Sequence, residues 1–83
     1  MKDLNNLNDW LDIQEHQKIG EILMQCGKLS LQNLGIALDI QKIKNIQIGD
    51  ILVNIKVITT DELEKALVLQ KEIDRTIGEN NAV

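Results

Sequence analysis

The sequence predicts an all-α fold of two tandem helix–turn–helix units with a 29-residue period, preceded by an N-terminal helix. The first observation is an internal repeat: residues 18–41 and 47–70 align without a gap and are identical at eight of 24 positions. The second is a helix-capping residue at the same place in each copy, Ser30 and Thr59. The third is the helical spacing of apolar residues that follows each cap. A repeat of this length is typical of a supersecondary unit used more than once.

Length and composition restrict the class of protein. A chain of 83 residues suffices for one small domain. Its 43% hydrophobic and 27% charged residues are typical of a globular chain, and no stretch approaches the roughly 20 apolar residues of a membrane span. The net charge of −4 and the lack of Tyr and Phe argue against a general DNA- or RNA-binding protein, which needs cationic and stacking side chains.

The single cysteine, Cys26, cannot form an internal disulfide, and this favours a reducing, cytoplasmic setting. Together with the single histidine, His16, it supplies too few ligands for a structural zinc site, so no metal or cofactor is expected. Because Cys26 follows an apolar stretch, we expect it in the core. The acidic N-terminus is unlike a secretion signal.

Residues 1–17 lie outside the repeat and are expected to form an amphipathic helix. Leu4, Leu7 and Leu11, with Trp10 beside them, make a narrow apolar stripe on an acidic segment. The segment is interpreted as a lid over the core, with a helix that docks a partner as the alternative.

In the first unit Gly27 is expected to end a helix in a left-handed conformation, and Ser30 to cap the next. In the second unit Thr59 and Glu62 form a capping box, and Lys56 stands where the first unit has its glycine.

Residues 46–60 also allow a strand, because they are rich in β-branched residues. Helix is favoured because residues 22–26, which align with the middle of this stretch, contain good helix formers. The repeat domain is assigned to residues 18–75. Residues 76–83 are assigned to a tail or to the start of an interrupted third copy.

The charge is distributed unevenly, with net charges of −3, +2 and −3 over residues 1–17, 18–46 and 47–83. The middle third therefore suits a small anion best. A folded-back helical pair in each unit is expected to bring Lys18 near Gln41, and Gln47 near Gln70. Gly20 and Gly49 stand at helix entrances, where free amides attract phosphate. Two such half-sites predict a ligand with two similar halves, each with a phosphate and a flat polar base.

These residues resemble a known motif, that of the MshEN domain of type II secretion and type IV pilus assembly ATPases. The family pattern is RLGxxL, ten residues and LxxxLxxQ, repeated after a five-residue spacer. Residues 18–70 follow this spacing without a gap, with Ile at the second position of both copies. The leading arginine is Lys18 in the first copy and Gln47 in the second.

The resemblance implies a receptor domain for cyclic di-GMP in signal transduction to a pilus or secretion system. The two motif glutamines are implied to bind guanine edges, the glycines to allow close approach, and the leucines to pack on the ligand or in the core. The implied ligand-binding residues are Lys18, Ile19, Gly20, Leu23, Leu34, Leu38, Gln41, Gln47, Ile48, Gly49, Leu52, Leu63, Leu67 and Gln70.

No enzyme is expected, because the Gly20–Lys28 segment lacks the spacing of a phosphate-binding loop and no nucleophile pairs with His16. The expected partners are cyclic di-GMP and a pilus or secretion ATPase or platform protein, without membrane insertion. The alternative function is a degenerate domain that binds no nucleotide and docks such a protein. A third hypothesis is an oligomerisation or repeat-capping fragment, suggested by the interrupted third copy.

Overall fold

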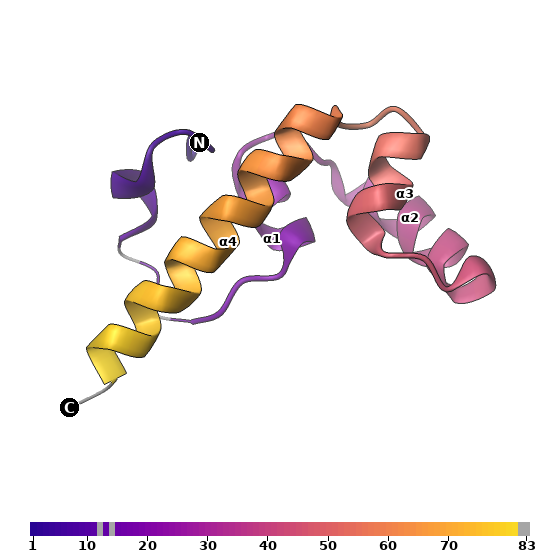
Figure 1. The fold of residues 1–83 in the computed structure, drawn as a ribbon. Helices are drawn as coiled ribbons and strands as arrows, with labels where there is room; N and C mark the ends of the chain where they lie inside the picture. The colour runs from indigo at the N-terminus through magenta and orange to yellow at the C-terminus, as the bar shows by residue number, and fades with distance from the viewer. Residues whose placement is uncertain (12, 14, 82–83) are drawn as a thin grey trace.

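The structure, a computed structural model, describes residues 1–11, 13 and 15–81, the side chains of residues 79–81 excepted. Its α-helices are α1 (Ile19–Gln25), α2 (Leu31–Lys44), α3 (Ile48–Asn54) and α4 (Thr60–Asn81) (Figure 1). All regular structure in the described residues is helical, which confirms the predicted all-α class. The strand considered for residues 46–60 is not formed, and α3 occupies the middle of that stretch.

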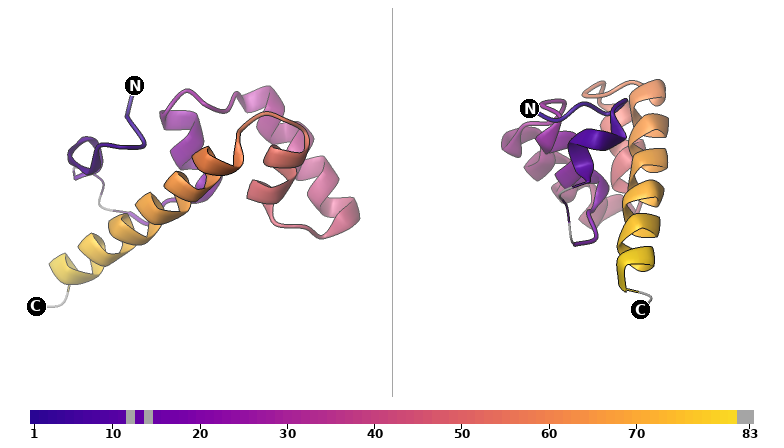
Figure 2. Two further views of the ribbon diagram at one scale, coloured as in Figure 1. Left: turned by 45° about the horizontal axis from the view of Figure 1, so that its top comes forward. Right: turned by 90° about the vertical axis from the view of Figure 1, so that its left-hand side faces the viewer.

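The helices pack across the two sequence copies. Helix α1 lies against α4, whereas α2 lies against α3, and α1 and α3 meet between them (Figures 1 and 2). Each short helix therefore packs on the long helix of the other copy. The sequence had instead predicted that the two helices of each unit pack on each other. The molecule is elongated, with extents of 42 × 23 × 20 Å, because the C-terminal part of α4 projects beyond the other helices (Figure 2).

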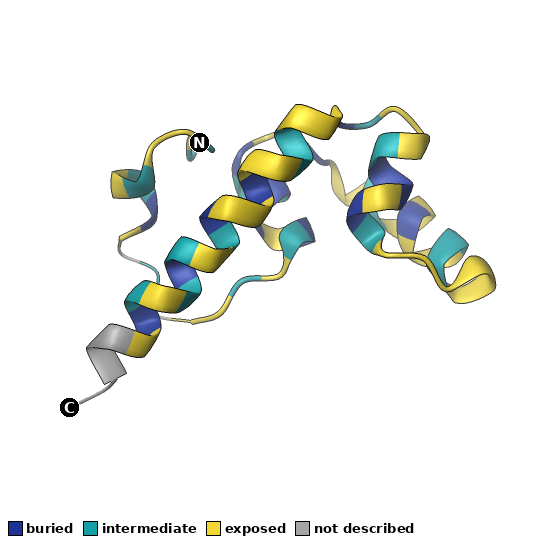
Figure 3. Ribbon diagram, in the orientation of Figure 1, coloured by how far each residue is buried: buried dark blue, intermediate teal, exposed yellow. Residues whose placement is uncertain are grey.

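Much of the core is formed by residues at corresponding positions of the two copies. Figure 3 shows the buried stretches along the helices. Leu23 and Leu52, from α1 and α3, are fully buried, as are Ala37 and Ala66 from the long helices. Cys26 is a free thiol in this cluster, as predicted. Burial, helped by the nearby carboxylate of Asp3, raises the pKa of the Cys26 thiol to about 11.

The two turns have the same geometry. Gly27 ends α1 with φ of 72°, and Lys56 follows α3 with φ of 65°. In both turns the next N–H returns to a leucine carbonyl, from Lys28 to Leu23 and from Val57 to Leu52, each at 2.9 Å. This is the pattern of a helix that ends in a left-handed residue. Lys56 adopts it with a side chain, which costs free energy that glycine avoids.

The N-terminal helix predicted over residues 1–17 is wrong. The described part of this segment has one 3₁₀ helix, Leu7–Trp10, and is otherwise irregular; Asp12 and Gln14 lie outside the described residues. Its short polar side chains bind nearby main-chain N–H groups: Asp3 Oδ1 accepts from Asn5 at 2.9 Å and Asn6 Oδ1 from Asn8 at 3.1 Å. Such local bonds compete with helix formation.

Trp10 anchors the segment in the core. Its ring is buried, and its indole N–H donates to the Asp3 carbonyl oxygen at 2.8 Å. Farther along, the His16 imidazole contacts the Asp74 carboxylate on α4, with Nδ1 2.6 Å from Oδ1. The segment therefore covers one side of α4, in agreement with the lid interpretation.

Helix α4 continues without a break through the region assigned to a third copy. Thr76 and Gly78 are interior to the helix, and Ile77 is buried in the core. The Thr76 hydroxyl donates to the Glu72 carbonyl oxygen at 2.9 Å, so it does not start a new unit. The boundary drawn after residue 75 thus falls inside a helix; residues 82–83 lie outside the described residues. None of the described helices is long and apolar enough to span a membrane.

Candidate functional site

A single open cleft brings together most of the residues that the motif singled out. It has a volume of about 700 Å³ and lies between the starts of the two short helices and the facing sides of the two long helices. The lining residues are Lys18, Ile19, Gly20, Glu21, Leu34, Leu38, Gln41, Gln47, Ile48, Gly49, Asp50, Leu63, Leu67 and Gln70. This size is within the usual range for a small-molecule site.

The lining is paired throughout. Every lining residue from the first copy has a counterpart 29 positions later that also lines the cleft, as Lys18 has Gln47. The exposures are matched too: Leu38 and Leu67 are each 42% exposed, although both are apolar. The cleft therefore presents two similar halves, each with two partly open leucines and the glutamine of one long helix.

The glutamines of the two long helices, Gln41 and Gln70, make equivalent hydrogen bonds. Gln41 Nε2 donates to the Ile46 carbonyl oxygen at 3.1 Å, and Gln70 Nε2 donates to the Gln17 carbonyl oxygen at 2.8 Å. Gln17 and Ile46 are themselves 29 positions apart, and each lies just before the residue that precedes a short helix. Each long helix is thus tied to the start of the short helix that packs on it. No described residue donates to either glutamine Oε1, so this acceptor and one N–H remain for a ligand.

The two motif glycines make room for leucines. A Cβ on Gly20 would lie 3.2 Å from Leu34 Cδ1, and one on Gly49 would lie 2.5 Å from Leu63 Cδ1. A side chain at Gly49 would therefore displace Leu63, which lines the cleft. Gly20 and Gly49 occupy the second residues of α1 and α3, as the entrance assignment required.

Leu23 and Leu52 do not reach the cleft. Both are fully buried between the helices, so they belong to the core rather than to the ligand-binding set. The reason is their position three residues after the motif glycine, which puts them almost one helical turn deeper.

Two acidic residues were absent from the expected set. Glu21 and Asp50 follow the motif glycines and line the two halves of the cleft. Glu21 Oε1 accepts from the Lys18 main-chain N–H at 3.2 Å, which fixes the first turn of α1. The signal was present in the sequence, because a carboxylate recurs at this position in both copies.

The electrostatics of the cleft differ from those of a phosphate site. Lys18 is the only cationic side chain among its lining residues, against the two carboxylates. Lys42 and Lys44, which lie in the expected spacer, instead complete the last turn of α2 and are outside the lining. A ligand in the cleft would therefore be held mainly through its hydrogen-bond donors and its apolar faces, with Lys18 as the one cation in the lining for its charged groups.

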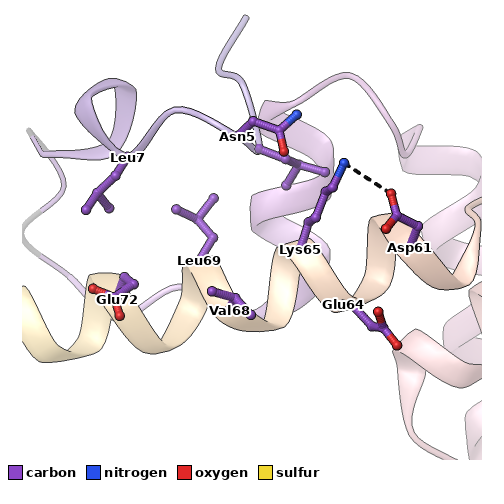
Figure 4. Close-up of a pocket in the computed structure, with 9 residues that line it drawn as sticks. Asn5, Leu7, Asp61, Glu64, Lys65, Val68, Leu69 and Glu72 are labelled. Carbon is purple, nitrogen blue, oxygen red and sulfur yellow. Dashed lines mark ion pairs between the residues drawn. The ribbon is translucent and has the colours of Figure 1, made fainter.

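A second, smaller groove of about 410 Å³ lies between the N-terminal segment and α4 (Figure 4). Leu7 and Leu69 face each other across it, and Lys65 is paired with Asp61 at 3.1 Å. Its members do not recur as pairs between the two copies. The paired cleft is the stronger candidate site.

Comparisons of the chain with protein families, with curated proteins and with solved structures find no match. The functional argument therefore depends on the cleft and on the motif resemblance.

Proposed function

We propose that the paired cleft binds cyclic di-GMP and that the protein is a receptor domain for this nucleotide in a pilus or secretion system. The observation that carries the proposal is the pairing of every lining residue between the two copies. A cyclic dinucleotide has two equivalent halves, so a site with two equivalent halves matches its symmetry. The motif resemblance supplies the identity of the ligand.

In this proposal each half of the cleft receives one guanine base. Leu38 or Leu67 offers an exposed apolar face for the base. The free Oε1 and N–H of Gln41 or Gln70 match the mixed donors and acceptors of a guanine edge.

The two carboxylates give a reason for guanine over adenine. Guanine presents adjacent N1–H and N2–H₂ donors, whereas the same edge of adenine presents an acceptor at N1. Glu21 and Asp50 line the cleft, one in each half, and carboxylate oxygens accept from such donors. Hydrogen bonds to a charged acceptor are about twice as strong as neutral ones. We expect cyclic di-GMP to bind and cyclic di-AMP to bind at least tenfold more weakly.

Calorimetric titration with cyclic di-GMP tests the proposal directly, with GTP, a linear dinucleotide and cyclic di-AMP as comparisons. We expect saturable binding at tens of micromolar or tighter, and a loss of tenfold or more in Gln41→Ala and in Asp50→Asn. The matched control is Gln32→Ala, because this exposed glutamine of α2 lies outside the cleft. A flat trace for folded wild-type protein would refute the proposal.

A docking domain without nucleotide binding is the second candidate. It is favoured by the composition of the cleft, where Lys18 and Gln47 stand in place of the family's two arginines and two carboxylates lie nearby. Arginine offers a planar fork for bases and phosphates that neither residue reproduces.

The described packing changes how docking should be tested. Deleting residues 1–17 would remove the buried Trp10 ring and expose the core, so loss of partner capture would have no clear meaning. Glu64→Lys, on the wall of the smaller groove, changes the surface and leaves Trp10 in place. With a purified secretion-platform domain as the probe, unchanged capture by this variant would count against docking at that groove.

A further inference from the structure

The two cleft glutamines depend on acceptors at very different places in the chain. Gln41 Nε2 donates to the Ile46 carbonyl oxygen, which lies five residues away, just past the end of the same helix. Gln70 Nε2 donates to the Gln17 carbonyl oxygen, which lies 53 residues away. Gln17 belongs to residues 15–18, an irregular stretch that leads into α1 and that we call the strap. The chain itself keeps the first acceptor near its donor, whereas the second acceptor needs a separate anchor.

Gln25, the last residue of α1, supplies that anchor. Its Nε2 donates to Gln17 Oε1 at 2.9 Å, and both residues are half-buried. The same Nε2 lies 3.3 Å from the Glu21 carbonyl oxygen, one turn earlier in α1. Because both N–H groups of the Gln25 amide have acceptors, the orientation of this side chain on α1 is fixed.

Residue 25 is also where both ends of the N-terminal segment reach α1. The main-chain N–H of Lys2 donates to the Gln25 carbonyl oxygen at 3.1 Å, while the Gln25 side chain binds Gln17. The two contacts use different atoms of Gln25. Truncating its side chain therefore releases the strap and leaves the main-chain contact with Lys2 in place.

The second copy lacks both members of the amide pair. Ile46 stands where the first copy has Gln17, and Asn54 stands where it has Gln25. Asn54 is exposed, and its side chain makes no hydrogen bond with any residue that the structure describes. The amide pair thus occurs only beside the cleft glutamine whose acceptor is remote in sequence.

We infer that Gln25 is a positioning residue for the cleft, which holds the strap so that the Gln17 carbonyl fixes the side-chain amide of Gln70. A carbonyl oxygen accepts and cannot donate, so it takes an N–H of Gln70 and leaves Oε1 on the other side of the planar amide. This oxygen is then the acceptor for the donors of a ligand. The effect on ligand binding rests on the proposed function, whereas the orientation of the amide does not.

The other anchor of the strap is weaker. His16 Nδ1 lies 2.6 Å from Oδ1 of Asp74, one turn after Gln70 on α4, but the two side chains are 71% and 45% exposed. Exposed pairs of this kind contribute little, because water and salt screen them. The pair also attaches residue 16 rather than the carbonyl of Gln17. We therefore expect Gln25 to have the larger effect on the cleft.

The side-chain amide of Gln70 provides a test that needs no ligand. In proton–nitrogen NMR spectra of the whole chain, Gln25→Ala should shift the Gln70 side-chain signals and speed their exchange with solvent about threefold, because their hydrogen bond is weakened. The signals of Gln41 should stay in place. Asn54→Ala is the matched control, because it truncates the corresponding last residue of α3 and should leave the Gln70 signals unchanged. Unchanged Gln70 signals in Gln25→Ala would overturn the inference.

Titration with cyclic di-GMP then measures the effect on binding. Gln25→Ala should bind about threefold more weakly than the wild type, whereas Asn54→Ala should bind equally well. Gln17→Ala removes the same contact from the other side and keeps the main-chain carbonyl, so the double variant should bind no more weakly than either single variant. Wild-type affinity in folded Gln25→Ala, or additive losses in the double variant, would overturn the positioning role. A wild-type chain that binds no cyclic di-GMP would refute the proposed function alone, and the Gln70 signals would then decide the role of Gln25.

Discussion

The amide of Gln70 donates to the main-chain oxygen of Gln17 at 2.8 Å, which joins positions 53 residues apart in the sequence. The corresponding bond of Gln41 reaches Ile46, only five residues away. The two bonds are equivalent in position, yet only the first connects the C-terminal helix to the N-terminal third of the chain. The two halves of the cleft are therefore alike in shape and unlike in their connections.

We expect Gln70→Ala to lower the free energy of unfolding by about 1 kcal/mol, the usual value for a partly buried hydrogen bond. Gln41→Ala, which removes an exposed and local bond, should cost less than half as much. Urea denaturation followed by circular dichroism measures both. Equal losses in the two variants would contradict the asymmetry.

Lys56 is expected to be replaceable by glycine with a gain in stability. Its φ of 65° is unfavourable for a residue with a side chain, whereas Gly27 adopts the same conformation freely in the first copy. Lys56→Gly should raise the free energy of unfolding by about 0.5–1 kcal/mol. Gly27→Ala should lower it. As a control, Lys42→Gly, in the last turns of α2, should destabilise the protein because its backbone is helical.

The Cys26 thiol should be unreactive in the folded protein. Since its pKa is raised to about 11, the thiolate is scarce at pH 8, and the side chain is also buried. We expect alkylation by iodoacetamide at pH 8 to be at least a hundredfold slower in the native than in the denatured chain. Rapid labelling of native protein would show that the core opens readily.

The same pKa shift has a consequence for stability at high pH. A group whose pKa is raised on folding contributes stability that is fully present below its unfolded value and is lost as the pH rises through the folded value. The contribution of Cys26 should therefore fall between pH 9.0 and about 11. In Cys26→Ala this loss should be absent from the pH profile measured by urea denaturation. A profile unchanged by the substitution would contradict the assignment.

Glu62 should contribute stability that acid removes. The main-chain N–H of Thr59 donates to its Oε1 at 2.9 Å, and this bond, together with Lys28 3.3 Å away, lowers the Glu62 pKa below 4.5. A lowered pKa means that the contribution is present above pH 4.5 and is lost as the pH falls through the folded value. Thermal unfolding of Glu62→Gln should depend less on pH below 4.5 than that of the wild type.

The N-cap hydroxyl on the same helix provides an independent check. Thr59→Ala removes the Oγ1 acceptor of the Glu62 N–H, which lies 3.1 Å away. We expect a loss of about 1 kcal/mol at neutral pH. Ser30→Ala should cost a similar amount at α2, because Ser30 Oγ accepts from Asn33 at the same distance.

Local signals in the sequence were sufficient to place the helix ends. Ser30, Thr59 with Glu62, and Gly27 each act on neighbouring main-chain groups, and all of them function as predicted. Most of the residues that line the cleft could also be predicted from the sequence, because the motif spacing fixes which residues share a helix face. Glu21 and Asp50 were missed because the motif leaves their position unspecified.

The N-terminal segment shows where local reasoning fails. Leu4, Leu7 and Leu11 have helical spacing, but the side chains of Asp3 and Asn6 accept from main-chain N–H groups that a helix would use. The buried ring of Trp10 then holds the irregular path against α4. Apolar spacing does not reveal such competition, since it takes no account of the side-chain bonds.

The sequence by itself determined the two copies, the helical character of each and the residues that repeat on their faces, because caps, turns and periodicity act over a few residues. Only the tertiary structure decided that α1 packs on α4 and α3 on α2. It also decided that Leu23 and Leu52 are buried while Leu38 and Leu67 remain open. The physical reason is that a side chain becomes buried only where two helices pack together. Which helices pack together depends on the arrangement of the whole chain around one core.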